Sequence, residues 1–246
     1  MSQYVQSVSI PRSGHHFLIK LLRRYFNEGR SDAKRMSYCE YYNCCSARPC
    51  RLIGSEDWSS MEVHFQKSHD RWLRRSDEES EPPMSVTKDT KHLIQFRHPV
   101  PSTISDYRLH TKRLQDKAEK ANLPWPPAFS EEQWMSFARP QLKYRIRFLE
   151  KWVLQNPWRD SEQYYLLNYE SFVTRPLDTL CEVVRFALPS EQINLDRAQS
   201  ALASRPVKAI RNPMDFEFAS TLADLERMCS DVWTECEKKL DHLIFS

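Results

Sequence analysis

The sequence predicts an α/β fold in three layers: a central parallel sheet flanked by helices, with a P-loop-like nucleotide site after its first strand. Short runs of β-branched and apolar residues alternate with segments that have the periodicity of amphipathic helices. One of only three glycines lies in the turn between the first strand and the first helix. At 246 residues and 40% hydrophobic content, the chain can bury the core of one domain, 1–246.

The first strand, turn and helix form the most informative segment. Residues 4–10 read YVQSVSI, which is typical of a strand. Apolar residues recur at helical spacing over residues 17–26. Gly14 permits a tight turn between them, so the first N–H groups of the helix point at one spot and favour an anion there. The residues of this predicted phosphate site are Arg12, Ser13, Gly14, His15 and His16.

This turn differs from the common Gly-x-x-x-x-Gly-Lys-Ser/Thr loop, which binds nucleotides together with Mg²⁺. His15 and His16 follow Gly14, so the lysine and the magnesium-binding hydroxyl are both missing. A P-loop nucleotide or small-molecule kinase is therefore disfavoured but stays open as an alternative. An ordinary strand-to-helix turn with exposed basic residues is the other alternative at this point.

The turn resembles the 5′-phosphosulfate loop of sulfotransferases, Pro-Lys/Arg-Ser-Gly-Thr-Thr-Trp, with histidines in place of the threonines and Phe17 in place of the tryptophan. A second segment strengthens the resemblance. A strand is predicted over residues 92–96, and the residues after it fill every fixed place of the family pattern Arg-x-Pro-x-x-x-x-x-Ser-x-Tyr. These residues are Arg97, Pro99, Ser105 and Tyr107. The resemblance implies that Arg97 and Ser105 bind the 3′-phosphate of the donor, 3′-phosphoadenosine 5′-phosphosulfate.

Two further segments match the same family. Residues 66–69, QKSH, resemble its Lys-Thr-His segment at a strand end, which implies that His69 is the general base and that Lys67 steadies the leaving group. Residues 164–170 resemble a strand ending in Tyr-Glu, so Tyr169 is expected beside the adenine. The helix expected next runs from Pro176 and ends before Pro189, with its apolar side formed by Leu180, Val183, Val184 and Leu188.

The reaction implied is direct transfer of a sulfuryl group to an acceptor hydroxyl. The loop residues hold the 5′-phosphosulfate, Phe17 packs against the adenine, and Arg12 assists Lys67 in stabilising the leaving group. No metal is expected, because positive side chains replace it. The region around Arg205, Lys208 and Arg211 lies where the family often has a donor-covering loop, and Arg211 is counted among the donor-binding residues. Carbohydrates, lipid-linked sugars and small phenols or alcohols all stay open as acceptors, with a preference for carbohydrate or glycolipid.

Composition narrows the partners and the location. A formal net charge of +3 is too small to indicate nucleic-acid binding. No window holds the roughly 18 apolar residues of a membrane span, and no leader pattern precedes the first strand. A cytoplasmic enzyme is therefore expected. A non-catalytic binding protein that keeps the nucleotide fold as a scaffold stays open as a third reading, although the presence of both Lys67 and His69 argues against it.

The cysteines and two loops complete the predictions. Four cysteines lie within twelve residues, and thiols, disulfides and a zinc site all stay open for them: Cys39, Cys44, Cys45 and Cys50. Core positions are expected for Cys181, Cys229 and Cys236. Residues 76–83 are read as an acidic surface loop. Trp125 and Phe129 are candidates for the acceptor pocket, and plain packing of their loop stays open as the alternative. Ser130 and Gln133 predict a capping box that opens a helix.

Overall fold

The structure is a computed structural model. It describes residues 2–28, 35–40, 50–51, 55, 60–69, 89–124, 130–156, 161–204 and 215–244. The chain packs into two compact units, of which the first contains β1 to β5, α1 and α5 to α7. The second contains α3, α4, η3, η5 and α8. The prediction of a single domain over 1–246 stays a prediction.

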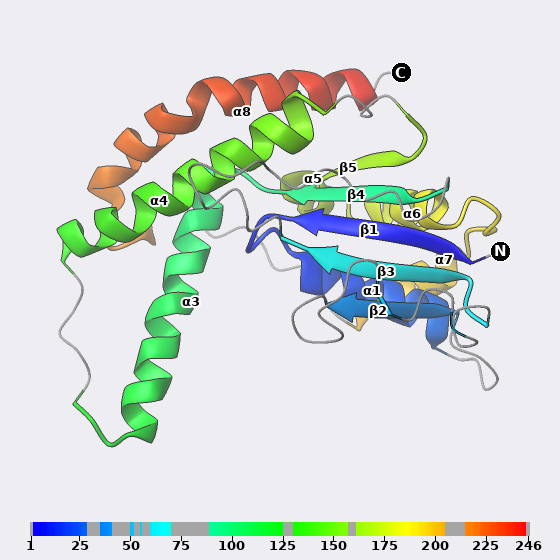
Figure 1. Ribbon diagram of the computed structural model, residues 1–246, viewed down its shortest axis with the longest axis horizontal. Coiled ribbons are helices and arrows are strands. Elements are labelled where there is room, and N and C mark those ends of the chain that lie inside the picture. Colours follow the sequence, from blue (N-terminus) through cyan, green and yellow to red (C-terminus); the bar gives the residue numbers. More distant parts are fainter. Residues whose placement is uncertain are drawn as a thin grey trace. The chain divides into compact units, whose positions relative to one another are not determined.

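The first unit is built on a five-stranded sheet in which all neighbouring strands are parallel (Figure 1). Its order is β2-β3-β1-β4-β5, so β1 lies in the centre with β3 on one side and β4 on the other. Ligands of open α/β folds bind at the carboxyl ends of the strands, where the strand order reverses. The strands are β1 (Gln3–Ser9), β2 (Met36–Glu40), β3 (Val63–Ser68), β4 (Lys91–Phe96) and β5 (Tyr164–Asn168).

The helices that the structure describes in the first unit are α1 (His15–Asn27), α5 (Tyr169–Thr174), α6 (Pro176–Ala187) and α7 (Leu195–Ala203). The predicted α/β fold with a central parallel sheet flanked by helices is confirmed. The apolar side predicted for the helix after Pro176 is also buried as expected. The buried residues of this core include Leu18, Leu21, Leu22, Phe65, Phe172, Leu180, Val183 and Val184.

One predicted boundary is wrong. The sequence predicts that the last strand extends through Tyr169 and Glu170, but α5 begins at Tyr169. The side chain of Asn168 is the reason, because its oxygen accepts a hydrogen bond from the backbone N–H of Ser171 at 2.9 Å. This is an N-cap, which satisfies a donor of the first helical turn and ends the strand.

A buried arginine fixes the start of β2. Arg35, which directly precedes this strand, forms ion pairs with Glu191 after α6 and with Glu62 before β3. The hydrogen bonds that Arg35 donates to Glu191 and Glu62 raise the pKa of the guanidinium above its ordinary value. Arg35 therefore ties the edge strand to two other parts of the first unit, and β2 in turn carries Glu40 at its carboxyl end.

The second unit is helical. It comprises α3 (Pro99–Lys120), α4 (Glu131–Leu149), the π-helical segment η3 (Glu150–Leu154), the short 3₁₀ helix η5 (Ala219–Thr221) and α8 (Leu222–Ile244). The predicted capping box is confirmed, since Ser130 and Gln133 each accept a hydrogen bond from the other's backbone N–H. Aromatic rings from separate elements fill the core of this unit, among them Tyr107, Trp134 and Phe216.

Arg145 on α4 is fully buried and links α4 to α3. Its Nε donates to Ser102 Oγ at 2.8 Å, and its Nη2 lies 3.0 Å from Asp106 Oδ2. Its Nη1 donates to the backbone oxygen of Gln141 at 2.9 Å. A buried guanidinium is tolerated only when its donors are satisfied in this way, so Arg145 fixes how the two helices meet.

We expect Arg145→Met to lower the free energy of unfolding by about 3 kcal/mol, because Asp106 and Ser102 would lose their buried partner. Urea denaturation monitored by circular dichroism measures the effect. Arg139→Met, at an exposed position of the same helix, is the matched control and should change the stability by less than about 0.5 kcal/mol. Equal midpoints for the two variants would show that the buried network contributes nothing.

Several predicted features lie outside the described residues: the acidic segment 76–83, Trp125, Phe129, Cys44, Cys45, Arg205, Lys208 and Arg211. The core positions of Cys181, Cys229 and Cys236 are confirmed, and Cys39 and Cys50 are buried as well. Among the helices that the structure describes, none combines the length and the apolar character needed to span a bilayer.

Candidate active site

The turn after β1 adopts an unusual backbone conformation. Arg12 and Gly14 both have left-handed φ values, 69° and 83°. Ser13 between them is buried, and its hydroxyl donates to the backbone oxygen of Ile10 at 2.9 Å. From β4, the side-chain amide of Gln95 donates to the backbone oxygen of Ser13 at 2.6 Å. A non-glycine residue in the left-handed region is uncommon and concentrates at functional sites.

Gly14 is needed at its position for two reasons. It is the N-cap of α1 with a left-handed backbone, and a Cβ atom there would lie 2.7 Å from two ring carbons of Tyr169. Tyr169 therefore packs directly over the glycine of the turn. Because α1 begins at the next residue, its first N–H groups lie at the turn, where the positive end of the helix favours an anion.

His15 lies beneath the turn in a buried position. Its Nδ1 is 3.3 Å from the Ser7 hydroxyl, and its Nε2 is 3.4 Å from the Tyr38 hydroxyl. Burial lowers its pKa well below the ordinary value, and the neighbouring charges of Lys67 and His69 lower it further. The neutral imidazole of His15 is therefore favoured.

His16, Lys67 and Glu40 form a second group beside the turn. Lys67 Nζ lies 2.8 Å from Glu40 Oε1 and 3.0 Å from His16 Nε2. The Lys67 side chain is 3% exposed, that of Glu40 26% and that of His16 64%, so the ammonium is the innermost of the three. Burial and then the charge of Lys67 lower the pKa of His16, which leaves its neutral ring to accept a hydrogen bond from the ammonium.

His69 follows β3 directly and contacts the end of β1. Its Nδ1 lies 2.7 Å from the backbone oxygen of Ser9. A carbonyl oxygen only accepts, so Nδ1 carries the proton of the neutral ring and Nε2 carries the lone pair. The backbone thus selects the tautomer that a general base needs, and His69 and Lys67 are both near enough to His15 to depress its pKa.

Phe17 and Tyr169 belong to the first unit, whereas Arg97, Ser105 and Tyr107 belong to the second. Arg97 follows β4, is half-buried, and lowers the pKa of His98 after the larger effect of burial. Ser105 is half-buried on α3. Tyr107, which fills the last fixed place of the pattern, is buried among aromatic rings and packs edge-on against Trp134, with ring centroids 4.9 Å apart. Tyr107 therefore matches the family pattern but is a residue of the core.

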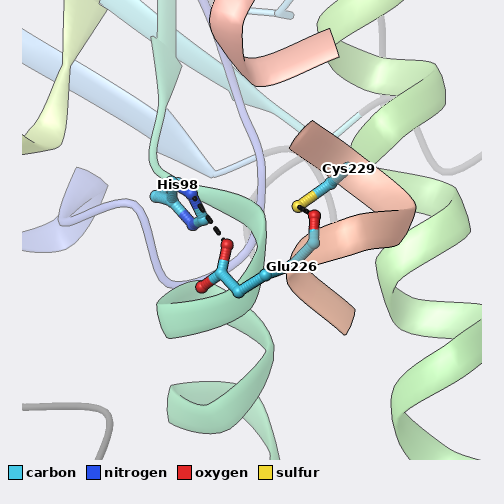
Figure 2. A group of neighbouring side chains, drawn as sticks. All are labelled: His98, Glu226 and Cys229. Carbon is cyan, nitrogen blue, oxygen red and sulfur yellow. Dashed lines mark hydrogen bonds and ion pairs between the residues drawn. The ribbon is translucent and has the colours of Figure 1, made fainter. Parts of the chain in front are cut away.

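Among the described residues, one cluster outside the turn combines metal-ligating types: His98, Glu226 and Cys229. Figure 2 shows the His98 ring facing the Glu226 carboxylate, with Nε2 3.4 Å from Oε2. His98 Nδ1, however, accepts the backbone N–H of Val100 at 3.3 Å and caps α3. The neutral ring therefore carries its proton on Nε2, directed at Glu226, and this arrangement joins α3 to α8 without needing an ion.

Several described residues that contact the site were not identified from the sequence, among them Ser7 and Tyr38 beside His15. Glu40 pairs with Lys67, Gln95 holds the turn, and the backbone of Ser9 orients His69. Glu40 and Gln95 both lie at or near the carboxyl end of a strand, which is the one signal that points to them. They act through the residues that the motifs did identify.

A parallel sheet whose central strand is followed by a phosphate-type turn and a helix defines a nucleotide-binding α/β fold. Two solved structures indicate which nucleotide-binding fold this chain resembles. The first is mouse sulfotransferase SULT7A1 complexed with PAP, at a TM-score of 0.55 and 14% identity, covering 86% of this chain and 68% of that one. The second is retinol dehydratase in a complex with retinol and PAP, at a TM-score of 0.56 and 14% identity, covering 93% and 80%.

The chain therefore has a sulfotransferase-like fold, as its motifs predict. No protein-family model matches the chain, and no curated protein matches it. One of the two similar structures is named as a dehydratase, so the likeness alone does not assign a reaction. The assignment has to come from the residues of the site.

Proposed function

We propose that this chain is a sulfotransferase that transfers a sulfuryl group from 3′-phosphoadenosine 5′-phosphosulfate to an acceptor hydroxyl. The observation that carries the proposal is the joint position of three features in the first unit: the glycine turn at the start of α1, the buried ammonium of Lys67, and the oriented ring of His69. A P-loop kinase would instead have a lysine and a magnesium-binding hydroxyl after the glycine, and His15 and His16 stand at those positions.

The turn fits a phosphosulfate group. The close packing of Gly14 and Tyr169 leaves no room for a side chain, while the helix N-terminus and Arg12 favour negative charge. Tyr169 and Phe17 are the proposed partners of the adenine. Arg97 and Ser105 are the proposed ligands of the 3′-phosphate, on the strength of the sequence pattern. Arg211, outside the described residues, is proposed as a further donor ligand.

In the proposed reaction, His69 Nε2 takes the proton of the acceptor hydroxyl as its oxygen attacks sulfur. The bond between sulfur and the bridging oxygen breaks, and adenosine 3′,5′-bisphosphate leaves. Lys67 and Arg12 stabilise the charge that develops on the bridging oxygen, which is the electrostatic part of catalysis. The hydrogen bond from His69 Nδ1 to Ser9 keeps the ring in the reactive tautomer throughout.

A carbohydrate or glycolipid hydroxyl is the proposed acceptor class. Support comes from the arginine in place of lysine in the first motif. The region around Arg205 to Arg211 also lacks the glycine-rich form of donor-covering loops. A screen of sugar, glycolipid and phenol acceptors with radiolabelled donor identifies the class, and transfer to phenols alone would contradict the assignment.

We expect the protein to bind adenosine 3′,5′-bisphosphate far more tightly than ATP, and to do so without Mg²⁺. The sequence pattern assigns Arg97 and Ser105 to a 3′-phosphate, which ATP lacks. A hydrogen bond to a charged group contributes about 1.5–3 kcal/mol, so Arg97→Ala should weaken binding at least about tenfold. Isothermal titration calorimetry measures both affinities.

Arg113→Ala is the matched control for this experiment, because it removes the same charge from an exposed position of α3. It should leave the affinity for the bisphosphate within about twofold of wild type. Equal affinity for ATP, or a strict requirement for Mg²⁺, would refute the sulfotransferase proposal and favour the kinase alternative. Tight bisphosphate binding with no transfer to any acceptor would favour the non-catalytic binding protein.

A further inference from the structure

Glu40 is an acidic side chain at a site proposed to bind a highly anionic donor. It ends β2, in register with Lys67 on β3. Its carboxylate lies 2.8 Å from the Lys67 ammonium and 3.7 Å from His16 Nε2. A carboxylate in this place repels phosphate and sulfate groups and therefore opposes donor binding. Glu40 therefore has to contribute to a step other than donor binding.

The geometry shows what Glu40 does to Lys67. The ammonium is buried at 3% exposure and has acceptors on two elements, Glu40 on β2 and His16 on α1. A buried ammonium without an anionic partner is unfavourable, and its flexible stem would move toward any available anion. Glu40 supplies the partner, and the ion pairs of Arg35 hold β2, the strand that carries it.

We propose that Glu40 is a positioning residue that keeps Lys67 from binding the donor too strongly before the reaction. The inference rests on the proposed sulfotransferase function. With its charge balanced by Glu40, Lys67 interacts weakly with the uncharged bridging oxygen of the bound donor. The interaction becomes strong when negative charge develops on that oxygen. Only interactions that are stronger in the transition state than in the ground state accelerate the reaction.

Glu40→Gln should therefore separate binding from turnover. The amide keeps the shape of the side chain but removes the negative charge, so the ammonium is left to bind the ground-state donor. We expect the affinity for the intact donor, 3′-phosphoadenosine 5′-phosphosulfate without acceptor, to rise by about two- to tenfold and kcat to fall by about tenfold or more. Calorimetry measures the affinity. The rate at saturating donor gives kcat. It is measured as transfer of the sulfuryl group to the acceptor found in the screen, or to water, which yields free sulfate.

Three comparisons make the result specific. Glu28→Gln removes one negative charge from an exposed ion pair with Arg24 at the far end of α1, so it controls for net charge and should change neither quantity. Glu40→Asp keeps the negative charge, so its donor affinity and kcat should stay close to those of the wild type. In a Lys67→Met background, Glu40→Gln should cause no further loss of kcat, because the residue through which it acts is gone.

Two results would overturn the inference while leaving the sulfotransferase proposal intact. One is a Glu40→Gln enzyme that matches Glu28→Gln in both affinity and kcat. The other is a loss of kcat as large as that of His69→Ala that persists in the Lys67→Met background, because the carboxylate would then act directly on the substrate. Absence of bisphosphate binding by the wild-type protein would instead refute the proposed function itself.

Discussion

Gly14→Val should abolish binding of adenosine 3′,5′-bisphosphate while the chain still folds. Gly14 has a φ of 83°, a conformation that a β-branched residue adopts only with strain. Its first side-chain atom would also lie 2.7 Å from the Tyr169 ring, which the adenine is proposed to contact. Displacing the ring and distorting the start of α1 should weaken binding on the order of 100-fold or more.

Two further variants separate the steric cause from the backbone cause. Gly14→Ala should lose less affinity, because alanine is not β-branched, although its Cβ meets the same ring. Because the adenine is proposed to contact Tyr169, Tyr169→Ala alone is the reference for the double variant. In that background Gly14→Val meets no ring but keeps the strained backbone, so it should cost less affinity than it does in the wild type. Calorimetry gives the affinity, and thermal unfolding checks that each variant is folded. Normal affinity in a folded Gly14→Val protein would mean that the turn is merely structural.

The parts of the site that the sequence could predict are those encoded over a few adjacent residues. The turn around Gly14 needs a strand before it, a helix after it and a glycine between, and all three are visible in one short segment. Lys67 and His69 follow from a motif at the end of a buried strand. Such features depend on local backbone geometry, which neighbouring residues determine.

The parts that could not be predicted depend on which strands are neighbours. Glu40 reaches Lys67 because β2 pairs with β3, and nothing near residue 40 indicates that pairing. His15 looks like a surface ligand in the sequence, yet Ser7 and Tyr38 contact it from two strands and burial keeps it neutral. Tyr107 matches a functional pattern but packs in an aromatic core, because its neighbours come from helices far along the chain.

His69→Ala should lower kcat by about 10²–10⁴-fold and leave the affinity for adenosine 3′,5′-bisphosphate nearly unchanged, since a positioned general base contributes a factor of this size. His69→Asn is the sharper variant, because its amide can still donate to the backbone oxygen of Ser9 but has no basic nitrogen. A role in holding β3 against β1 would be rescued by asparagine, whereas a role as base would not.

The measurement is the rate at saturating donor and acceptor, so that binding does not enter. His110→Asn, at an exposed position of α3, is the matched control and should retain the wild-type rate. Lys67→Ala should lower both kcat and donor affinity, whereas the two His69 variants should lower kcat alone. If kcat of His69→Ala stayed within a fewfold of wild type, the base would have to be another group. His16 would then come next, because it is exposed and beside Lys67, whereas His15 is buried with both nitrogens near hydroxyl groups.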